Sequence, residues 1–477
     1  MRFSTCPATI SPRRSRRTAL RCNRAALPDI DRITDRKLAG IVLEGGRLRT
    51  LLLELWQRTR MDWGFVTDRL AQTFRKETWI GAHERRFIGE ILYGLVRHLR
   101  RIDAALARGR ATERAPRDLE RLIALLVLER LIEPARLTRG RGPAGGAAEL
   151  AGIDWNAVAG IDEVIARERK LVPRIALAAS LPDWLAARLA LDWGDEAEPL
   201  ALALNQRAPM TVRANLRVGD RAALAHQLQR AGIASRPGAW CETALHLETR
   251  TNLFALEAFK RGAMEAQDEG SQLLAELAVA PPGGLVVDLC AGAGGKTLAI
   301  AARMANRGRI VSTDVDARKL DELRRRARRA GVTCAQALHL DAGRWPPALD
   351  ALRGKADVVL VDAPCSGIGS LRRNPEARWR LREADLATFA ARQKQILGEA
   401  RALVAPGGRL VYATCTLLRI ENAEVVAAVV GPGFAPVPLT EVLGARGAAL
   451  GDDTAFTVTP HRHGTDGFYA QVLRRTA

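Results

Sequence analysis

At 477 residues the chain is too long for one ordinary hydrophobic core, and about three domains are expected. Its formal charge of +20 favours nucleic acid as a partner, although a merely basic, well-solvated surface would give the same surplus. The sequence has no apolar run that approaches the roughly 18 residues of a membrane span. The seven cysteines are widely spaced without a C-x-x-C pair, which argues against a disulfide framework or a metal site and indicates a reducing cytoplasm.

The first part of the chain is basic and then helical. Residues 1–40 are rich in arginine and poor in acids, and they are expected to form a disordered basic arm. Residues 41–140 carry apolar positions three and four apart with arginines between them, which predicts a helical bundle with a basic outer face. A Gly/Pro-rich break opens the stretch 141–180, which is interpreted as a linker.

The rest of the chain alternates between helix and strand patterns. Residues 181–270 predict a small α+β module. From 271 to 477 strands are expected near 285–289, 309–313, 335–340, 356–361, 408–413 and 468–473, with helices between them. This pattern predicts an α/β fold with a doubly wound sheet, whose functional residues gather at the carboxyl ends of the strands.

A glycine-rich loop follows the first of these strands in the run VVDLCAGAGGKT. Glycines permit a tight turn and let a ligand approach the backbone, and the next helix offers free N–H groups. A phosphate-binding P-loop would need glycine where Cys290 stands, and a dinucleotide fingerprint would need glycine where Thr297 stands. Asp314, at the end of the second strand, is placed to accept hydrogen bonds from a ribose. S-adenosylmethionine is a ligand that fits, and a purely structural glycine turn is the alternative.

Two cysteines follow neighbouring strand ends. Cys365 comes after Asp362 at the end of the fourth strand, and Cys415 comes after the fifth strand. C5 of a pyrimidine is not nucleophilic enough to take a methyl group from a sulfonium, but a thiolate that adds to C6 activates it. An acid such as Asp362 would help by protonating the base at N3.

These motifs resemble the Sun/RsmB family of bacterial 16S ribosomal RNA cytosine-5 methyltransferases. The matching runs are QDEGSQLL, DLCAGAGGKT, DAPCSGIGSLRRNP, YATCT followed by EN, and HGTDGFY. The resemblance implies a class I, Rossmann-like S-adenosylmethionine-dependent methyltransferase domain over residues 271–477, preceded by an all-α NusB-like RNA-binding domain and the small module. It also implies ribosomal RNA as the substrate and is consistent with a monomer.

The resemblance assigns roles to individual residues. Cys415 becomes the nucleophile, Cys365 assists product release, and Asp362 protonates the base. The cofactor site it implies consists of Cys290, Ala291, Gly292, Ala293, Gly294, Gly295, Lys296, Asp314, Asp341 and Asp362.

Three arginines after Cys365, namely Arg372, Arg373 and Arg378, are expected to meet RNA phosphates, and a solvated charge run is the alternative. The sequence departs from the family pattern at Ala293, where proline is usual, and at Leu418 to Ile420. The first change is expected to loosen the loop slightly, and the second bears on the orientation of Cys415. Two rival functions remain: a non-catalytic RNA-binding scaffold, and an amino-group methyltransferase, which would carry an aromatic residue at position 365.

Overall fold

The computed structural model describes residues 35–111, 113–138, 150–341 and 345–476. Most of the expected basic arm, residues 1–34, lies outside this range. The first described helix, α1, already spans Arg36–Glu44, so helical structure begins before the expected boundary at residue 41. Within the described residues, no helix is long and apolar enough to cross a membrane.

The N-terminal region is all-helical. The long helix α4 packs against α2 and α5, and its Ile91, Leu92 and Leu95 are fully buried. The remaining apolar positions recur every three to four residues, so each helix buries one face in a shared core. The bounds are α1 (Arg36–Glu44), α2 (Arg47–Asp62), α3 (Val66–Lys76), α4 (Ala82–Gly109), α5 (Asp118–Leu128) and α6 (Pro134–Thr138).

Residues 150–180, which were expected to be part of a linker, form helices instead. These are α7 (Trp155–Ala159), α8 (Ile161–Arg167) and α9 (Leu171–Ala178). Trp155, Val158 and Ile161 are buried in the helical core, so apolar burial holds this stretch in place. Residues 141–149 of the expected linker lie outside the described residues.

A small antiparallel sheet follows two further helices. After α10 (Asp183–Trp193) and α11 (Ala197–Leu204), the sheet has the order β2-β3-β1-β4 and carries α12 and α13. Its main pair is formed by β1 and β3, with Val212 opposite Leu245. The bounds are β1 (Met210–Ala214), α12 (Arg221–Arg230), β2 (Ser235–Pro237), β3 (Ala244–Leu247), α13 (Glu257–Lys260) and β4 (Met264–Ala266).

The C-terminal part is a larger mixed sheet with strand order β10-β12-β9-β8-β5-β6-β7, and β11 pairs with β12. The strands β5 to β9 run parallel, whereas β12 is antiparallel to β9. The bounds are β5 (Leu285–Asp288), β6 (Arg309–Asp314), β7 (Ala335–His339), β8 (Ala356–Asp362), β9 (Val404–Thr414), β10 (Phe434–Pro436), β11 (Ala455–Val458) and β12 (Phe468–Arg475). These strands include all six that the sequence predicts, which confirms the doubly wound α/β fold.

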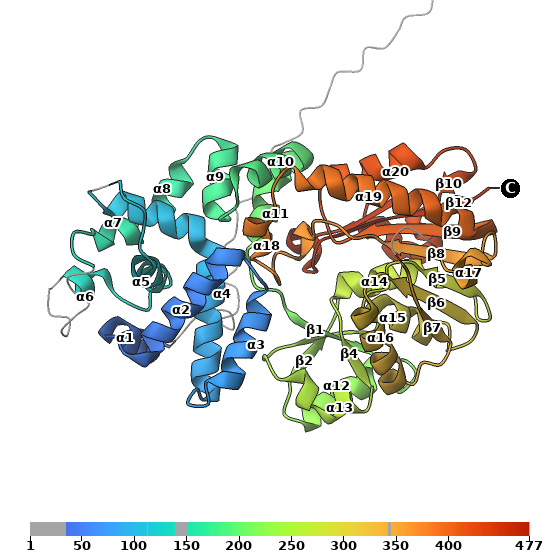
Figure 1. The fold of residues 1–477 in the computed structure, drawn as a ribbon, viewed down its shortest axis with the longest axis horizontal. Helices are drawn as coiled ribbons and strands as arrows, with labels where there is room; N and C mark the ends of the chain where they lie inside the picture. The colour runs from blue at the N-terminus through green and yellow to red at the C-terminus, as the bar shows by residue number, and fades with distance from the viewer. Residues whose placement is uncertain (1–34, 112, 139–149, 342–344, 477) are drawn as a thin grey trace, which may run out of the picture. The chain divides into compact units, whose positions relative to one another are not determined.

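Helices cover both faces of this sheet (Figure 1). Val286 of β5 points into a core with α14, α15 and α16, and its neighbour Val287 points into a second core with α19 and α20. Near-continuous apolar strands are what such double coverage requires. The bounds are α14 (Glu269–Leu277), α15 (Gly295–Arg303), α16 (Ala317–Ala330), α17 (Pro347–Asp350), α18 (Ala377–Arg380), α19 (Asp385–Ala400), α20 (Ala423–Val429), α21 (Leu439–Leu443) and α22 (Pro460–His463).

Candidate active site

The glycine loop joins β5 to α15 as a tight turn. Gly292 and Gly294 have φ of +55° and +81°, which disfavours other residues. A Cβ at Gly294 would approach Cγ of Leu323 to 2.5 Å, whereas one at Gly292 would meet nothing within 4 Å. The loop therefore packs on α16 on one side and leaves the backbone of Gly292 open on the other.

Asp314, at the end of β6, fixes this loop from the neighbouring strand. Its Oδ2 accepts a hydrogen bond of 2.9 Å from the Gly292 N–H, and its Oδ1 accepts one from the N–H of Asp316. The expected loosening at Ala293 is offset by Arg326 of α16, which donates to the Ala293 carbonyl at 2.8 Å. The loop is thus held by side chains on both flanks.

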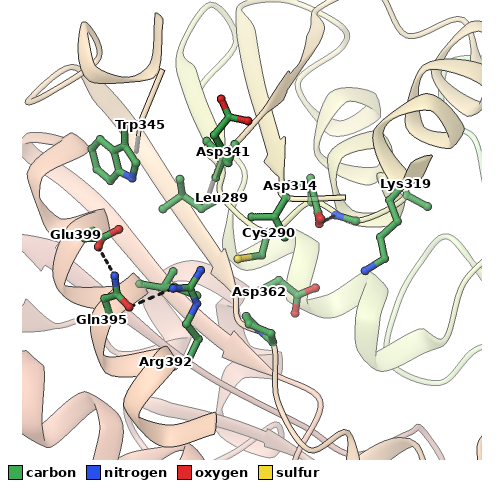
Figure 2. A pocket seen from close by; sticks show the side chains of 17 residues that line it. Leu289, Cys290, Asp314, Lys319, Asp341, Trp345, Asp362, Arg392, Gln395 and Glu399 are labelled. Carbon is green, nitrogen blue, oxygen red and sulfur yellow. Dashed lines mark hydrogen bonds between the residues drawn. The ribbon is translucent and has the colours of Figure 1, made fainter. Parts of the chain in front are cut away.

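A cavity of about 510 Å³ opens beside the loop at the carboxyl ends of the strands (Figure 2). Of the predicted cofactor residues, Cys290, Ala291, Gly292, Ala293, Asp314, Asp341 and Asp362 line it. Its donor set fits S-adenosylmethionine: an open glycine backbone, carboxylates for ribose hydroxyls and an amino group, and apolar walls for a purine. Gly294, Gly295 and Lys296 do not line this cavity. Gly294 is buried against α16, as described above.

Helix α19 forms the cavity wall that the sequence reasoning missed. Arg392, Gln395, Ile396 and Glu399 face the cavity, with Arg392 donating to Gln395 at 3.1 Å and Gln395 to Glu399 at 2.9 Å (Figure 2). Their spacing of three, four and seven residues places them on one helix face, a signal that was present in the sequence. Trp345 also lines the cavity, and no pattern in the sequence predicted its place there.

A second cavity, of about 300 Å³, adjoins the first. Gly295 and Lys296 line it, and Ala291 and Asp362 line both cavities. Lys296 is ion-paired with Asp362. Burial opposes the charge on Lys296, but the carboxylate of Asp362 outweighs it and raises the pKa of Lys296 above its usual value. This ion pair therefore lies between the two cavities.

Asp288, directly below the loop, is fully buried. Its Oδ2 accepts a hydrogen bond of 2.7 Å from the Thr297 hydroxyl. Burial raises the pKa of Asp288 to about 7, with the nearby carboxylate of Asp362 adding to the effect.

The structure brings the two predicted cysteines together. The strands β8 and β9 pair in parallel with Asp362 opposite Ala413, so Cys365 and Cys415 leave neighbouring strand ends. Their Sγ atoms are 3.4 Å apart. The hydrogen bond with Cys415, followed by burial, raises the pKa of Cys365 well above its usual value. Cys365 thus keeps its proton and can donate it towards the sulfur of Cys415.

A buried carboxylate joins the two cysteine loops. Glu421 accepts hydrogen bonds from the Ser366 N–H at 2.8 Å, from the Ser366 hydroxyl and from the Gln393 amide at 3.0 Å. The Ser366 hydroxyl also lies 3.0 Å from Oγ1 of Thr416. Since Ser366 follows Cys365 and Thr416 follows Cys415, this contact fixes the two loops relative to each other.

Two of the three arginines that were expected to meet phosphates, Arg372 and Arg378, are buried. Arg378 is fully buried and donates to the carbonyl of Ala179 and to Oδ1 of Asn205, and Arg372, which is 7% exposed, donates to the carbonyls of Gly464 and Thr465. This burial argues against phosphate contacts by these two side chains. Their guanidinium groups instead donate hydrogen bonds to main-chain carbonyls of segments that are distant in sequence.

Arg373 differs from the other two because its side chain is 35% exposed. It forms ion pairs with Asp268 and Asp466, and all three residues line the second cavity. The described residues contain no cluster of side chains suited to a metal ion.

The fold, the glycine loop and the cavity define a class I S-adenosylmethionine-dependent methyltransferase. Family models agree: the 16S rRNA methyltransferase RsmB/F model matches residues 277–474, and a model of the ferredoxin-like domain of RsmF/B-like methyltransferases matches residues 181–253.

Similar proteins extend this match. The probable ribosomal RNA small subunit methyltransferase B of Bacillus subtilis is 35% identical over 308 residues, which cover 64% of this chain and 68% of that protein. A putative methyltransferase of Mycobacterium tuberculosis, MT1451, is 33% identical over 437 residues and covers 83% of this chain and 90% of its own. The solved structure of PH0851 superimposes with a TM-score of 0.68 at 25% identity, over 89% of this chain and 97% of that one. The chain belongs to the RsmB/F family of 16S rRNA methyltransferases.

Proposed function

We propose that the protein methylates C5 of a cytosine in 16S ribosomal RNA through a covalent bond between Cys415 and C6 of the base. The observation that supports this most directly is the pair of thiols, 3.4 Å apart, at the strand ends beside the cofactor cavity. An amino-group methyltransferase has no use for two thiols there. A non-catalytic scaffold would not need the ion pair, the loop and the cysteines together.

The residues divide the reaction between them. The Cys415 thiolate adds to C6, and Asp362 delivers a proton to N3, with Lys296 as the donor behind it. Bound S-adenosylmethionine supplies an electrophilic methyl group, which C5 accepts. For release, a water molecule takes the proton from C5, the C5=C6 double bond re-forms, the Cys415–C6 bond breaks to give back the thiolate, and N3 returns its proton to Asp362. Cys365 assists this step by hydrogen-bonding to the departing sulfur of Cys415.

Substrate binding is assigned to the regions before residue 271. We infer that the helical region, which resembles NusB, and the small antiparallel module contact the RNA, since the formal charge of +20 favours a polyanion. The protein is taken to act as a monomer in the cytoplasm, where its cysteines stay reduced.

Exchanging each cysteine in turn tests the mechanism. Cys415→Ala is expected to abolish methylation and to form no covalent adduct with RNA, because C5 is never activated. Cys365→Ala is expected to transfer the methyl group but to release the product slowly, so that a protein–RNA adduct persists in denaturing electrophoresis. Bisulfite sequencing of the treated 16S RNA identifies the modified base.

Cys334→Ala serves as the matched control, because this thiol lies next to β7 and does not line either cavity. It is expected to behave like the parent. An adduct that accumulates in Cys415→Ala and is missing in Cys365→Ala would reverse the two roles, and methylation at a position other than C5 would overturn the proposal.

A further inference from the structure

The helices α10 and α11 form a corner against the active-site loops. They are joined by the short 3-10 helix η2 (Gly194–Glu196), and we call the three elements the α10–α11 corner. The corner precedes the small antiparallel sheet, and neither cavity is lined by it. Its contacts nonetheless reach the segments that follow both cysteines.

An apolar core links the corner to both cysteine loops. Leu185, Leu189 and Leu200 of the corner are fully buried in this core. From the methyltransferase sheet the same core includes Ile368 and Leu371, which follow Cys365, and Leu417 and Leu418, which follow Cys415. The two loops therefore bury their apolar side chains against helices that lie outside the sheet.

Two hydrogen bonds fix the main chain just after Cys415. The indole N–H of Trp193 donates to the Leu417 carbonyl at 2.9 Å. Oδ2 of Asp192 accepts a bond of 3.0 Å from the Arg419 N–H, at the start of the 3-10 helix η6 (Arg419–Glu421). Because Leu417 is two residues from Cys415, a change at these bonds reaches the nucleophile through a short piece of main chain.

The corner also holds a third loop of the site. Glu196 binds His461 and Arg462 of α22, and the ring of His461 meets Trp193 edge-on at a centroid distance of 6.1 Å. The loop after α22 returns to the cysteines, since Gly467 N–H donates to the Gly369 carbonyl and Gly369 N–H donates to the Cys415 carbonyl. The α10–α11 corner thus contacts the two cysteine loops and the segment of α22.

We propose that the α10–α11 corner positions the thiol pair for reaction, with Trp193 as its principal positioning residue. The inference rests on the proposed function, which assigns Cys415 as the nucleophile. A thiolate that must approach C6 within a narrow range of directions is sensitive to small displacements of its main chain. The corner therefore contributes to methyl transfer by holding the Cys415 loop in position. This role is separate from any RNA binding by the neighbouring antiparallel module.

Trp193→Phe tests this, because it keeps a smaller aromatic ring in the corner and removes the N–H bond to Leu417. The direct readout is the rate at which diamide converts Cys365 and Cys415 into a disulfide, followed by mass spectrometry of the linked peptides. In that reaction the two thiols lose two hydrogens to the N=N bond of diamide. A shift of the Cys415 loop is expected to lower this rate about threefold or more and to lower kcat for RNA methylation about tenfold. The dissociation constant of S-adenosylmethionine is expected to stay within about twofold of the parent, because no corner residue lines its cavity.

The matched control is Trp56→Phe in the helical region. This variant likewise loses an indole N–H bond, here the one of 3.1 Å to Asp118, but Trp56 lies in the core of the helical region, away from the core that holds the residues after both cysteines. Asp192→Ala provides a second, independent variant and is expected to lower the disulfide rate in the same direction. If either corner variant proves unfolded by circular dichroism, the other decides.

A disulfide rate in the folded corner variants equal to that of the parent overturns the positioning role, whatever happens to methylation. If the parent methylates no cytosine at C5, the proposed function fails, while the disulfide rates still decide whether the corner positions the thiols.

Discussion

At the scale of single residues, Asp288, directly below the cofactor loop, is expected to make the stability of the protein depend on pH. Its carboxyl is buried with a pKa raised to about 7, compared with 3.8 for a free aspartate. A raised pKa means that the folded state holds the proton more tightly than the unfolded chain. The stabilisation is complete below pH 4 and is lost as the pH rises towards 7.

Asp288→Asn removes this titration while keeping an oxygen for the Thr297 hydroxyl. The variant is expected to gain stability relative to the parent as the pH rises from 5 to 8, by on the order of 1–4 kcal/mol. Denaturant unfolding of both proteins at several pH values measures this difference. A difference that does not change with pH would show that Asp288 does not titrate in this range.

The sequence predicted residues of the site where local motifs position them. The glycine loop, Asp314 and the two cysteines could be placed because each follows directly on a strand, and parallel strand ends meet at one edge. The burial of Arg372 and Arg378 could not be predicted. A run of arginines in the sequence looks the same whether its side chains face solvent or bond main-chain carbonyls between two segments. Their partners are main-chain carbonyls far away in sequence, such as Ala179 for Arg378.

At the scale of elements, η6 ties β8 to β9 through Glu421. Glu421→Gln is expected to weaken this junction, because the amide oxygen can still accept from the Ser366 N–H and the Gln393 amide, but the new NH₂ then faces the Ser366 hydroxyl, which can no longer donate to residue 421. We expect kcat to fall about tenfold to a hundredfold, since the bonded loops carry the reacting thiols. Single-turnover methylation of 16S RNA measures this effect.

Glu424→Gln is the matched control, three residues further on and exposed on α20. The same substitution there is expected to leave kcat unchanged. Equal rates for the two variants would remove Glu421 from any positioning role.

The elements themselves were largely predictable. Six of the eight strands of the large sheet were predicted, because they are apolar runs that end at polar or small residues, whereas the short β10 and β11 were not. The stretch 150–180 was read as a linker because it follows a Gly/Pro-rich break, although Trp155, Val158 and Ile161 already have helical spacing. Short helices of five to eight residues give weak periodic signals, and only packing against the core makes their assignment clear.

At the scale of the whole molecule, several arginines lie at internal contacts between segments instead of on the surface. Arg97, Arg372 and Arg378 hydrogen-bond to main-chain carbonyls at contacts between segments that are distant in sequence, as in the bond of 2.8 Å from Arg97 to the Arg372 carbonyl. Burial, and then the neighbouring charge of Arg97, lowers the pKa of Arg378 to about 9. These arginines therefore hold distant segments of the chain together, and direct phosphate contacts are left to the arginines and lysines at the surface.

The remaining surface charge predicts how RNA binding responds to salt. Each phosphate that the protein neutralises releases condensed counterions, so raising NaCl from about 50 to 200 mM is expected to weaken binding of 16S RNA fragments about a hundredfold or more. Binding of S-adenosylmethionine, held in a cavity by hydrogen bonds and apolar contacts, is expected to change by less than about twofold over the same range. Fluorescence anisotropy for RNA and calorimetry for the cofactor measure the two responses on the same protein. An RNA affinity that falls less than about threefold would mean that phosphate contacts contribute little and that shape and base contacts dominate recognition.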